Sequence, residues 1–528
     1  MPEKKQQQNG FFGGAAILAS GIIIVKIIGA VYKIPIVNVL GAGYADFQNA
    51  YYIYALLLTI STAGLPVALS KMISAAHAVG QEQQVQKIFR VSMRVFFTLG
   101  FCSFLVMFFG AEQLAALLHD PLAAKSIRAL SPAVLCIGCV SSFRGYAQGH
   151  AHMAPTAVSQ IIEALCKLFV GLGLAIWAVH AGRSADTAAA YAITGVTVGT
   201  VASLLYMAWQ HFRSRTIPRT KERCAPTGTI LKELLSIAIP ITLTSATVQL
   251  INLIDSSLVQ GRLQNALGMT LAESRSLFSA YSGVMNLYGL PAALIVSITA
   301  SVIPAVSARM ATGDTGGASL VVRSAYKVTA LAVLPMGVGM SVLSEPIVRM
   351  LFRTLDPVLS GQLLSVLGFA SIFVCLTTVS NSILQAYGHQ RIPVFIMITG
   401  GIIKVITNYT LVGQPAINIH GAPMGSLCCF FLSAMIDLTL IRRIVPEAPR
   451  YRDIFLRPIA ATAVMALAAK GSYLLLHTFL GNTVSTVLAV GAAVVVYAVA
   501  VVALRCVSRE DLALMPKGDK IARLLRIR

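Results

Sequence analysis

The sequence predicts an all-α polytopic membrane protein with about 14 transmembrane helices, arranged as two pseudo-symmetric six-helix lobes followed by a C-terminal helix pair. The first observation is the composition: of 528 residues, 56% are hydrophobic and 12% are charged, and the mean hydropathy is +0.76. Globular chains carry about 25% charged residues, so this chain cannot cover a water-facing surface. The second observation is a series of long apolar stretches, and the third is a repeat between the two halves of the chain.

Each apolar stretch is long enough to cross the hydrocarbon core as a helix, which satisfies its own backbone hydrogen bonds in lipid. We count fourteen such stretches. They lie near residues 12–37, 49–72, 88–110, 127–148, 155–180, 187–210, 233–260, 279–304, 321–345, 361–386, 392–413, 420–441, 456–478 and 483–505. The first one resembles a secretory signal, but it continues through Lys26 without a small-residue cleavage motif, so we expect a retained helix.

Basic residues predict the orientation, because short loops rich in Lys and Arg stay on the cytoplasmic side. With the N-terminus inside, most of the 41 Lys and Arg fall in cytoplasmic segments, above all in the loop 213–223, in the segment 442–452 and in the tail 505–528. We therefore expect a multi-pass protein of the bacterial cell membrane with both termini cytoplasmic. We attribute the net charge of +21 to topology and to contact with anionic membrane lipids, and we expect no nucleic-acid partner.

The two halves share a weak internal repeat, and transporters built from such repeats place their site at the repeat interface. Segment 73–95 recurs at a constant offset as 306–328, and the Gly149-His150 pair recurs as Gly388-His389. The resulting domain prediction is an N-lobe at 1–211, a basic cytoplasmic linker at 212–232, a C-lobe at 233–445, and two extra helices with a basic tail at 446–528.

The loops exclude most enzyme classes. None much exceeds about twenty residues, and no G-x-x-x-x-G-K-[ST] phosphate-binding loop occurs in the sequence. We therefore expect no enzyme activity, no cofactor, and transport driven by a gradient, with the coupling ion unknown. His150 and His152 form an H-x-H pair in a predicted loop with no further ligand in view, so we interpret them as solvated and expect no metal site.

Charged residues within the spans carry most of the functional information, because an ionised group at the bilayer centre costs about 2.5–3.5 kcal/mol and must face a cavity or a partner. The candidate cavity residues are Lys26, Lys33, Asp46, Arg144, Glu163, Lys167, Asp255 and Lys404. Basic groups outnumber acidic ones within the spans. This balance favours a cargo with phosphate or carboxylate groups over a cationic drug.

The first helix holds the most informative pair. Lys26 and Lys33 lie about 10 Å apart along one face, since seven residues make nearly two turns. Asp46 can pair with Lys33 across the following loop. For Lys26 two interpretations stay open: an interhelical salt bridge to Asp255 or Asp437, or the cationic wall of a substrate cavity.

Later spans contribute further candidates. Arg144 lies near a cytoplasmic helix end, where it can reach lipid headgroups or a ligand. Glu163 and Lys167 have the i, i+4 spacing at which opposite charges meet on a helix, so we expect them to neutralise each other. Lys404 has no acid in its own helix, and the same two aspartates, 255 and 437, are its candidate partners.

Three segments carry a resemblance to a known family: SGIIIVKIIGAVYKIPIVNVLGAG (20–43), AGLPVALSKMISAA (63–76) and FRGYAQGHAHMAPTAVSQIIEAL (143–165). They resemble the stage V sporulation protein B branch of polysaccharide transporters, which is related to lipid II flippases within the multidrug/oligosaccharidyl-lipid/polysaccharide flippase superfamily. The resemblance implies two lobes around a central cavity that opens alternately to the inside and the outside.

The same resemblance implies a function. The chain would be a flippase or exporter of an anionic undecaprenyl-pyrophosphate-linked saccharide for peptidoglycan or another surface polysaccharide. Lys26 and Lys33 would match cavity-lining basic residues of lipid II flippases, and Asp46 an acidic residue just beyond them. The chain departs from those flippases in lacking basic residues within spans two and eight, apart from Lys71 at the end of span two, so lipid II itself is not specified. The alternative is a cation-coupled multidrug or metabolite antiporter of the same fold.

Overall fold

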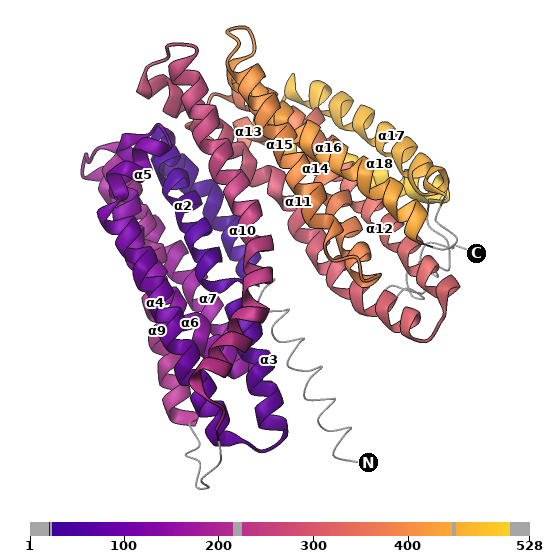
Figure 1. Ribbon diagram of the computed structural model, residues 1–528. Coiled ribbons are helices and arrows are strands. Elements are labelled where there is room, and N and C mark those ends of the chain that lie inside the picture. The colour runs from indigo at the N-terminus through magenta and orange to yellow at the C-terminus, as the bar shows by residue number, and fades with distance from the viewer. Residues whose placement is uncertain (1–20, 22–23, 215–223, 446–449, 507–528) are drawn as a thin grey trace. The chain divides into compact units, whose positions relative to one another are not determined.

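The computed structural model describes residues 21, 24–214, 224–445 and 450–506, and all the secondary-structure elements in these ranges are helices (Figure 1). The prediction of an all-α membrane protein is confirmed. Twelve segments of the described chain are long and apolar enough to cross a membrane, and the first of them, 24–78, has 55 residues. That length is about 80 Å of helix, enough for two crossings of a core about 30 Å thick. The number of fourteen stays a prediction.

Parts of the predicted organisation lie outside the described residues. These parts are the start of the first span, residues 215–223 of the basic loop, residues 446–449 and the basic tail from 507 onward. The linker expected at 212–232 stays a prediction, and helices occupy the described parts of both of its ends. α9 (Ala185–Ser214) continues to Ser214, and α10 (Thr227–Asn265) begins directly after Pro226. Helices extend past the apolar stretches because backbone hydrogen bonding does not end where the lipid does.

The chain divides into two compact units, residues 1–279 and 280–528. The division falls within α11 (Leu271–Ala311), so α10 and the first turns of α11 belong to the first unit. The two units are defined by contacts between residues, whereas the predicted lobes are defined by the internal sequence repeat. The organisation as six, six and two helices stays a prediction.

The first unit is a helical bundle. It contains α2 (Tyr44–Thr62), α3 (Leu65–Ala78), α4 (Glu82–Phe109), α5 (Ala111–Leu117), α6 (Ala124–Gly149), α7 (Ala154–Cys166), α8 (Leu172–His180), α9 and α10, with short turns at Gly41–Gly43 and Pro121–Ala123. Ile230 and Leu234 of α10 are buried against Leu65 and Leu69 of α3. A β-carbon at Gly64 would overlap the backbone of α10 at Ala238, so the close approach of these helices requires glycine there.

A widened helical turn interrupts the fifth predicted span. Residues Lys167–Gly171 form a π-helical segment between α7 and α8. Gly171 packs so tightly against Gly195 of α9 that a β-carbon on Gly195 would overlap the Gly171 backbone. Segments of this kind occur mostly as single turns and often at functional sites, and this one carries a candidate lysine.

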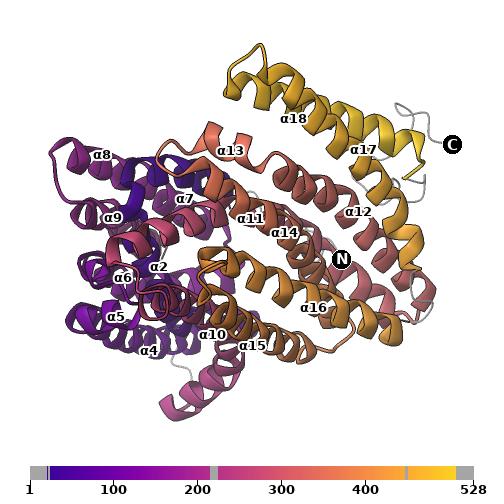
Figure 2. The ribbon, with the colours of Figure 1, turned by 90° about the horizontal axis from the view of Figure 1, so that it is seen from above.

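The second unit holds its own core. Its remaining helices are α12 (Thr315–Val342), α13 (Ser344–Leu351), α14 (Pro357–Ala386), α15 (Ile392–Val412), α16 (Gly421–Ile444), α17 (Tyr451–His477) and α18 (Asn482–Ala503). The two predicted extra helices are confirmed as α17 and α18, which run side by side next to α12 and α13 (Figure 2). Met465 and Ala493 pack with Leu343, and the Tyr497 hydroxyl donates a hydrogen bond to the Leu331 carbonyl at 2.8 Å. The helix pair is thus docked on the second unit.

Candidate functional site

Three lysines of the first unit lie close together, and we name Lys26, Lys33 and Lys167 the lysine cluster. Lys26 and Lys33 belong to the helix through residues 24–40, and both are exposed. Lys33 is near enough to both other lysines for their charges to repel its own. Among the described residues, no carboxylate forms an ion pair with Lys26 or Lys33, which favours the cavity-wall interpretation of Lys26 over the structural salt bridge.

Aromatic rings hold the third member of the cluster. Lys167 Nζ lies 5.0 Å from the centroid of the Tyr32 ring and 4.8 Å from that of Tyr51. A cation over an aromatic face is stabilised by the ring quadrupole without being neutralised. The two tyrosine rings therefore stabilise a positive charge on Lys167 without supplying a negative one.

Arg144 lies near the end of α6, as expected, and its guanidinium has partners within the first unit. Its Nε donates to Ser159 Oγ at 2.9 Å, and its Nη2 donates to Glu163 Oε2 and Ser203 Oγ, each at 3.2 Å. The expected salt bridge between Glu163 and Lys167 is wrong. The planar guanidinium fork satisfies three acceptors at once, whereas Lys167 sits in the widened turn against the tyrosine rings.

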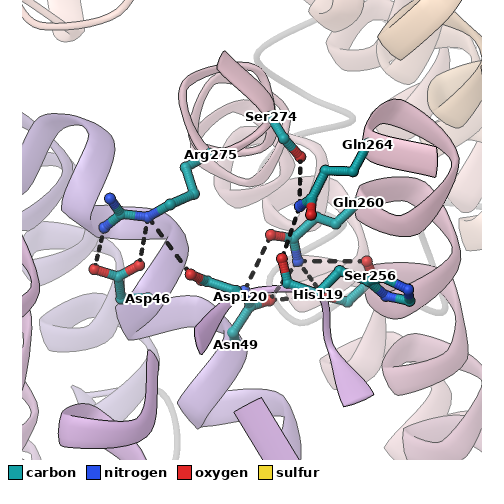
Figure 3. A network of polar contacts seen from close by, with 9 residues as sticks. All are labelled: Asp46, Asn49, His119, Asp120, Ser256, Gln260, Gln264, Ser274 and Arg275. Atoms are coloured by element: carbon teal, nitrogen blue, oxygen red, sulfur yellow. Dashed lines mark hydrogen bonds and ion pairs between the residues drawn. The ribbon is translucent and has the colours of Figure 1, made fainter. Parts of the chain in front are cut away.

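Asp46 also has a different partner from the expected one. Instead of pairing with Lys33, its buried carboxylate accepts hydrogen bonds from Arg275 Nε at 2.9 Å and from Arg275 Nη2 (Figure 3). Arg275 Nε also lies 3.5 Å from Asp120 Oδ1. One guanidinium thus faces two carboxylates that are both 0% exposed, and the group has one excess negative charge if all three are ionised.

Amide side chains extend this group into what we name the Arg275 network. Asn49 donates to Asp120 at 2.8 Å and accepts from Ser256 at 2.7 Å and from Gln260 at 3.1 Å (Figure 3). Within the first unit, the network therefore ties α2 and the segment around Asp120 to α10 and to the first turn of α11. We missed Arg275 in the sequence. Its position could have indicated it. Arg275 lies between the predicted spans 233–260 and 279–304, in a loop that the distribution of Lys and Arg places on the outer side, where basic residues are few.

Asp255 and Lys404 are both buried, at 8% and 4% exposure, and neither is without a partner. Asp255 lies on α10 of the first unit, and Lys404 lies on α15 of the second. Asp437 on α16 is fully buried. Within the described chain its two carboxylate oxygens have no partner at ordinary hydrogen-bond distance, and the Thr377 hydroxyl is the polar group beside them.

Comparison with known proteins agrees with this fold. The chain matches the family model described as polysaccharide biosynthesis protein over residues 11–310 and the model MatE over residues 240–410. The lipid II flippase MurJ of Bacillus subtilis (strain 168) is 26% identical over 478 residues, covering 86% of this chain and 87% of the relative. Stage V sporulation protein B of the same organism is 22% identical over 453 residues, covering 84% and 86%.

A solved structure of the lipid II flippase MurJ in an inward closed conformation has a TM-score of 0.71 at 13% identity, and the match covers 92% of this chain and 98% of that one. At this identity the likeness shows the fold. The resemblance found in the sequence is confirmed, and both the MurJ relative and the MurJ structure are named as lipid II flippases. The chain therefore belongs to the polysaccharide biosynthesis protein family, within the multidrug/oligosaccharidyl-lipid/polysaccharide superfamily of multi-pass membrane transporters and flippases.

Proposed function

We propose that this protein is a flippase for an undecaprenyl-pyrophosphate-linked saccharide, a precursor of peptidoglycan or of another surface polysaccharide. It would carry this lipid to the outer leaflet of the bacterial cell membrane by alternating access, with both of its termini in the cytoplasm. The observation that carries the proposal is the lysine cluster, which gathers three ammonium groups on the first unit. No described carboxylate is paired with the two exposed members, Lys26 and Lys33.

The energetics of charge in a membrane favour an anionic ligand at this cluster. If the three ammonium groups faced hydrocarbon, they would oppose membrane insertion by roughly 8–10 kcal/mol in total. They are stable in the membrane only where water, an anion or, for Lys167, the two tyrosine rings surround them. A pyrophosphate group has the complementary problem, because it cannot enter hydrocarbon without partners that replace its hydration.

The membrane potential gives the movement a direction. The cytoplasm of the cell is electrically negative. Moving one negative charge from the cytoplasm to the outside therefore lowers the free energy by about 2.3 kcal/mol per 100 mV of membrane potential. The polyprenyl chain can stay in lipid while the ammonium groups replace water around the headgroup. Outward movement of an anionic headgroup is then favourable without ATP hydrolysis.

The test is lipid translocation in proteoliposomes that contain the purified full-length protein and a fluorescent undecaprenyl-pyrophosphoryl saccharide. We expect Lys33→Ala and Lys26→Ala to lower the initial rate at least tenfold, and Lys33→Arg to retain much of it because the positive charge remains. Lys470→Ala is the matched control, since Lys470 is an exposed lysine of a membrane helix far along the chain in α17. Wild-type rates in both cluster variants, at equal protein content, would overturn the proposal.

A cation-coupled antiporter of the same fold is the second candidate, and Asp437 is the observation that favours it. A buried carboxylate whose oxygens lack ordinary hydrogen-bond partners is suited to take up a proton or a metal cation. Glu163 gives the antiporter no such support, because it is paired with Arg144. In the antiporter, Asp437→Asn abolishes ion-driven efflux of a cationic dye while the lysine variants leave it unchanged. In the flippase, the lysine variants abolish lipid translocation.

A further inference from the structure

Two turns at one end of the first unit bring together three side chains that are far apart in the sequence. His77 lies in the last turn of α3, Glu82 in the first turn of α4, and His150 caps the end of α6. Their ligand atoms all lie within 4.8 Å of one another. His77 Nδ1 is 2.6 Å from Glu82 Oε1, and the rings of His77 and His150 are 4.6 Å apart between centroids.

The local backbone fixes this arrangement. Gly80 adopts a φ of +75° between α3 and α4, a conformation that glycine reaches without strain, and it closes the turn that sets His77 beside Glu82. Ala151, at a φ of 59°, closes the turn after His150 in a region that alanine rarely occupies. His150 Nδ1 lies 3.0 Å from the Tyr146 carbonyl. This bond requires the proton on Nδ1 and leaves the Nε2 lone pair available for a ligand.

A cavity of about 430 Å³ adjoins the three residues, and it offers additional ligands. Its lining includes His152 and His211 as well as His77, Glu82 and His150. His211 stacks on the Phe89 ring at 4.7 Å between centroids, so it has a packing role. His152 lies two residues from His150 and lines the same cavity. Imidazole and carboxylate groups that meet at a water-accessible cavity are the donor set that zinc prefers.

The internal repeat shows that the fold does not need these residues. The α11–α12 turn has the same backbone as the α3–α4 turn, with Gly313 at a φ of +76° in place of Gly80. Yet the positions that correspond to His77 and Glu82 hold Met310 and Thr315. That second turn is stabilised by the ion pair of Arg309 with Asp314 at 3.1 Å. His77 and Glu82 are therefore not required to form the first turn.

We propose that His77, Glu82 and His150 form a binding site for one divalent transition-metal ion of the Zn²⁺ class, with His152 or water completing the coordination. Ligand atoms at about 2.0–2.2 Å from a tetrahedral ion lie roughly 3.3 Å from one another, so modest side-chain rotations would close the site. A bound ion would tie the α3–α4 turn to the α6–α7 turn within the first unit. The site is distinct from the lysine cluster and does not depend on the flippase proposal.

Metal binding to the purified full-length protein in detergent micelles tests this inference. Co²⁺ is the spectroscopic probe, because its d–d absorption reports tetrahedral nitrogen and oxygen ligation, and Zn²⁺ is then titrated in competition. We expect one Co²⁺ per chain, displaced by one Zn²⁺. His77→Ala, Glu82→Gln and His150→Ala should each weaken Zn²⁺ binding at least tenfold.

His389→Ala is the matched control, because His389 is the repeat counterpart of His150 and lacks partners equivalent to His77 and Glu82. It should leave Zn²⁺ affinity and stoichiometry unchanged. A single symmetric peak on size-exclusion chromatography would show that a variant has lost metal ligation and has not misfolded. Glu82→Gln provides a second control for folding, because it removes the carboxylate ligand and keeps the shape of the side chain. Absence of stoichiometric binding, or equal effects of the site variants and the control, would overturn the inference.

Discussion

The Arg275 network makes the sharpest stability prediction, because its charges do not balance. Arg275 faces Asp46 and Asp120, both fully buried, so the three groups together carry one excess negative charge when ionised. Arg275→Gln leaves two buried carboxylates without a cation. Removing one partner of a buried ion pair destabilises proteins by about 3–5 kcal/mol, and we expect Arg275→Gln to fall in this range.

Asp120→Asn should behave differently, although it changes the same network. Asp120 Oδ1 has no hydrogen-bond partner among the described residues, and Oδ2 accepts from Asn49, which an asparagine carbonyl can also do. The substitution leaves Arg275 and Asp46 as a matched pair. We therefore expect Asp120→Asn to lower the free energy of unfolding by less than about 1 kcal/mol, the size of one ordinary hydrogen bond.

The assay is equilibrium unfolding of the purified protein in mixed micelles with increasing SDS, followed by circular dichroism. The double variant Arg275→Gln/Asp46→Asn should recover part of the stability lost by Arg275→Gln, because it removes one of the two buried like charges that Arg275→Gln leaves without a cation. If Asp120→Asn is as damaging as Arg275→Gln, the argument from excess charge is refuted. The same holds if the double variant is less stable than Arg275→Gln alone.

Three further predictions use the same unfolding assay. Arg144→Ala should lower the free energy of unfolding by about 1–3 kcal/mol, because it leaves Glu163 without its ion-pair partner. Arg128→Ala breaks an exposed ion pair and should change the free energy of unfolding by less than about 1 kcal/mol. Equal losses of stability in the two variants would contradict the role of burial. Gly195→Val should cost at least about 1–3 kcal/mol through overlap with the Gly171 backbone, and a neutral result would show that α9 can move away. Tyr497→Phe should lose about 0.5–1.5 kcal/mol with its hydrogen bond to Leu331, and an unchanged midpoint would mean that the bond adds nothing to docking of the last two helices.

The sequence predicted the fold class well because transmembrane helices are specified locally. A stretch of apolar residues must form a helix in lipid whatever its neighbours are, so α17 and α18 could be predicted without tertiary information. Helix ends were predicted less well. α10 begins six residues before the predicted span at 233, in a segment whose polar residues resemble a loop.

The candidate site was predicted in its residues but not in its pairings. Burying a charge in a membrane is costly, so charged residues within apolar spans are candidates for a site. This rule identified Asp46, Arg144, Glu163 and Lys167. Their partners depend on which helices pack together, and periodicity along one helix does not contain that information. The i, i+4 rule favoured a Glu163–Lys167 bridge, but an arginine from another helix supplied a better set of donors.

The metal-site candidate was missed for a related reason. In the sequence, His150 and His152 were interpreted as a solvated pair because no third ligand was near them. His77 and Glu82 are about seventy residues earlier, and only the packing of α3 and α4 against α6 brings them beside His150. Neither a motif nor a spacing rule covers ligands that come from two separate turns.

Adding one residue to a helical turn without ending the helix rotates everything beyond it by about 100° relative to an uninterrupted α-helix. The π-helical segment at Lys167–Gly171 has this effect on α8, so a helical wheel drawn from α7 would assign the wrong angular positions to Trp177 and its neighbours. With α8 rotated in this way about its own axis, the Trp177 ring lies 5.4 Å from the Tyr191 ring of α9, measured between centroids. Deleting Val170 would restore regular winding, turn Trp177 away from Tyr191, and leave Lys167 in place directly after α7.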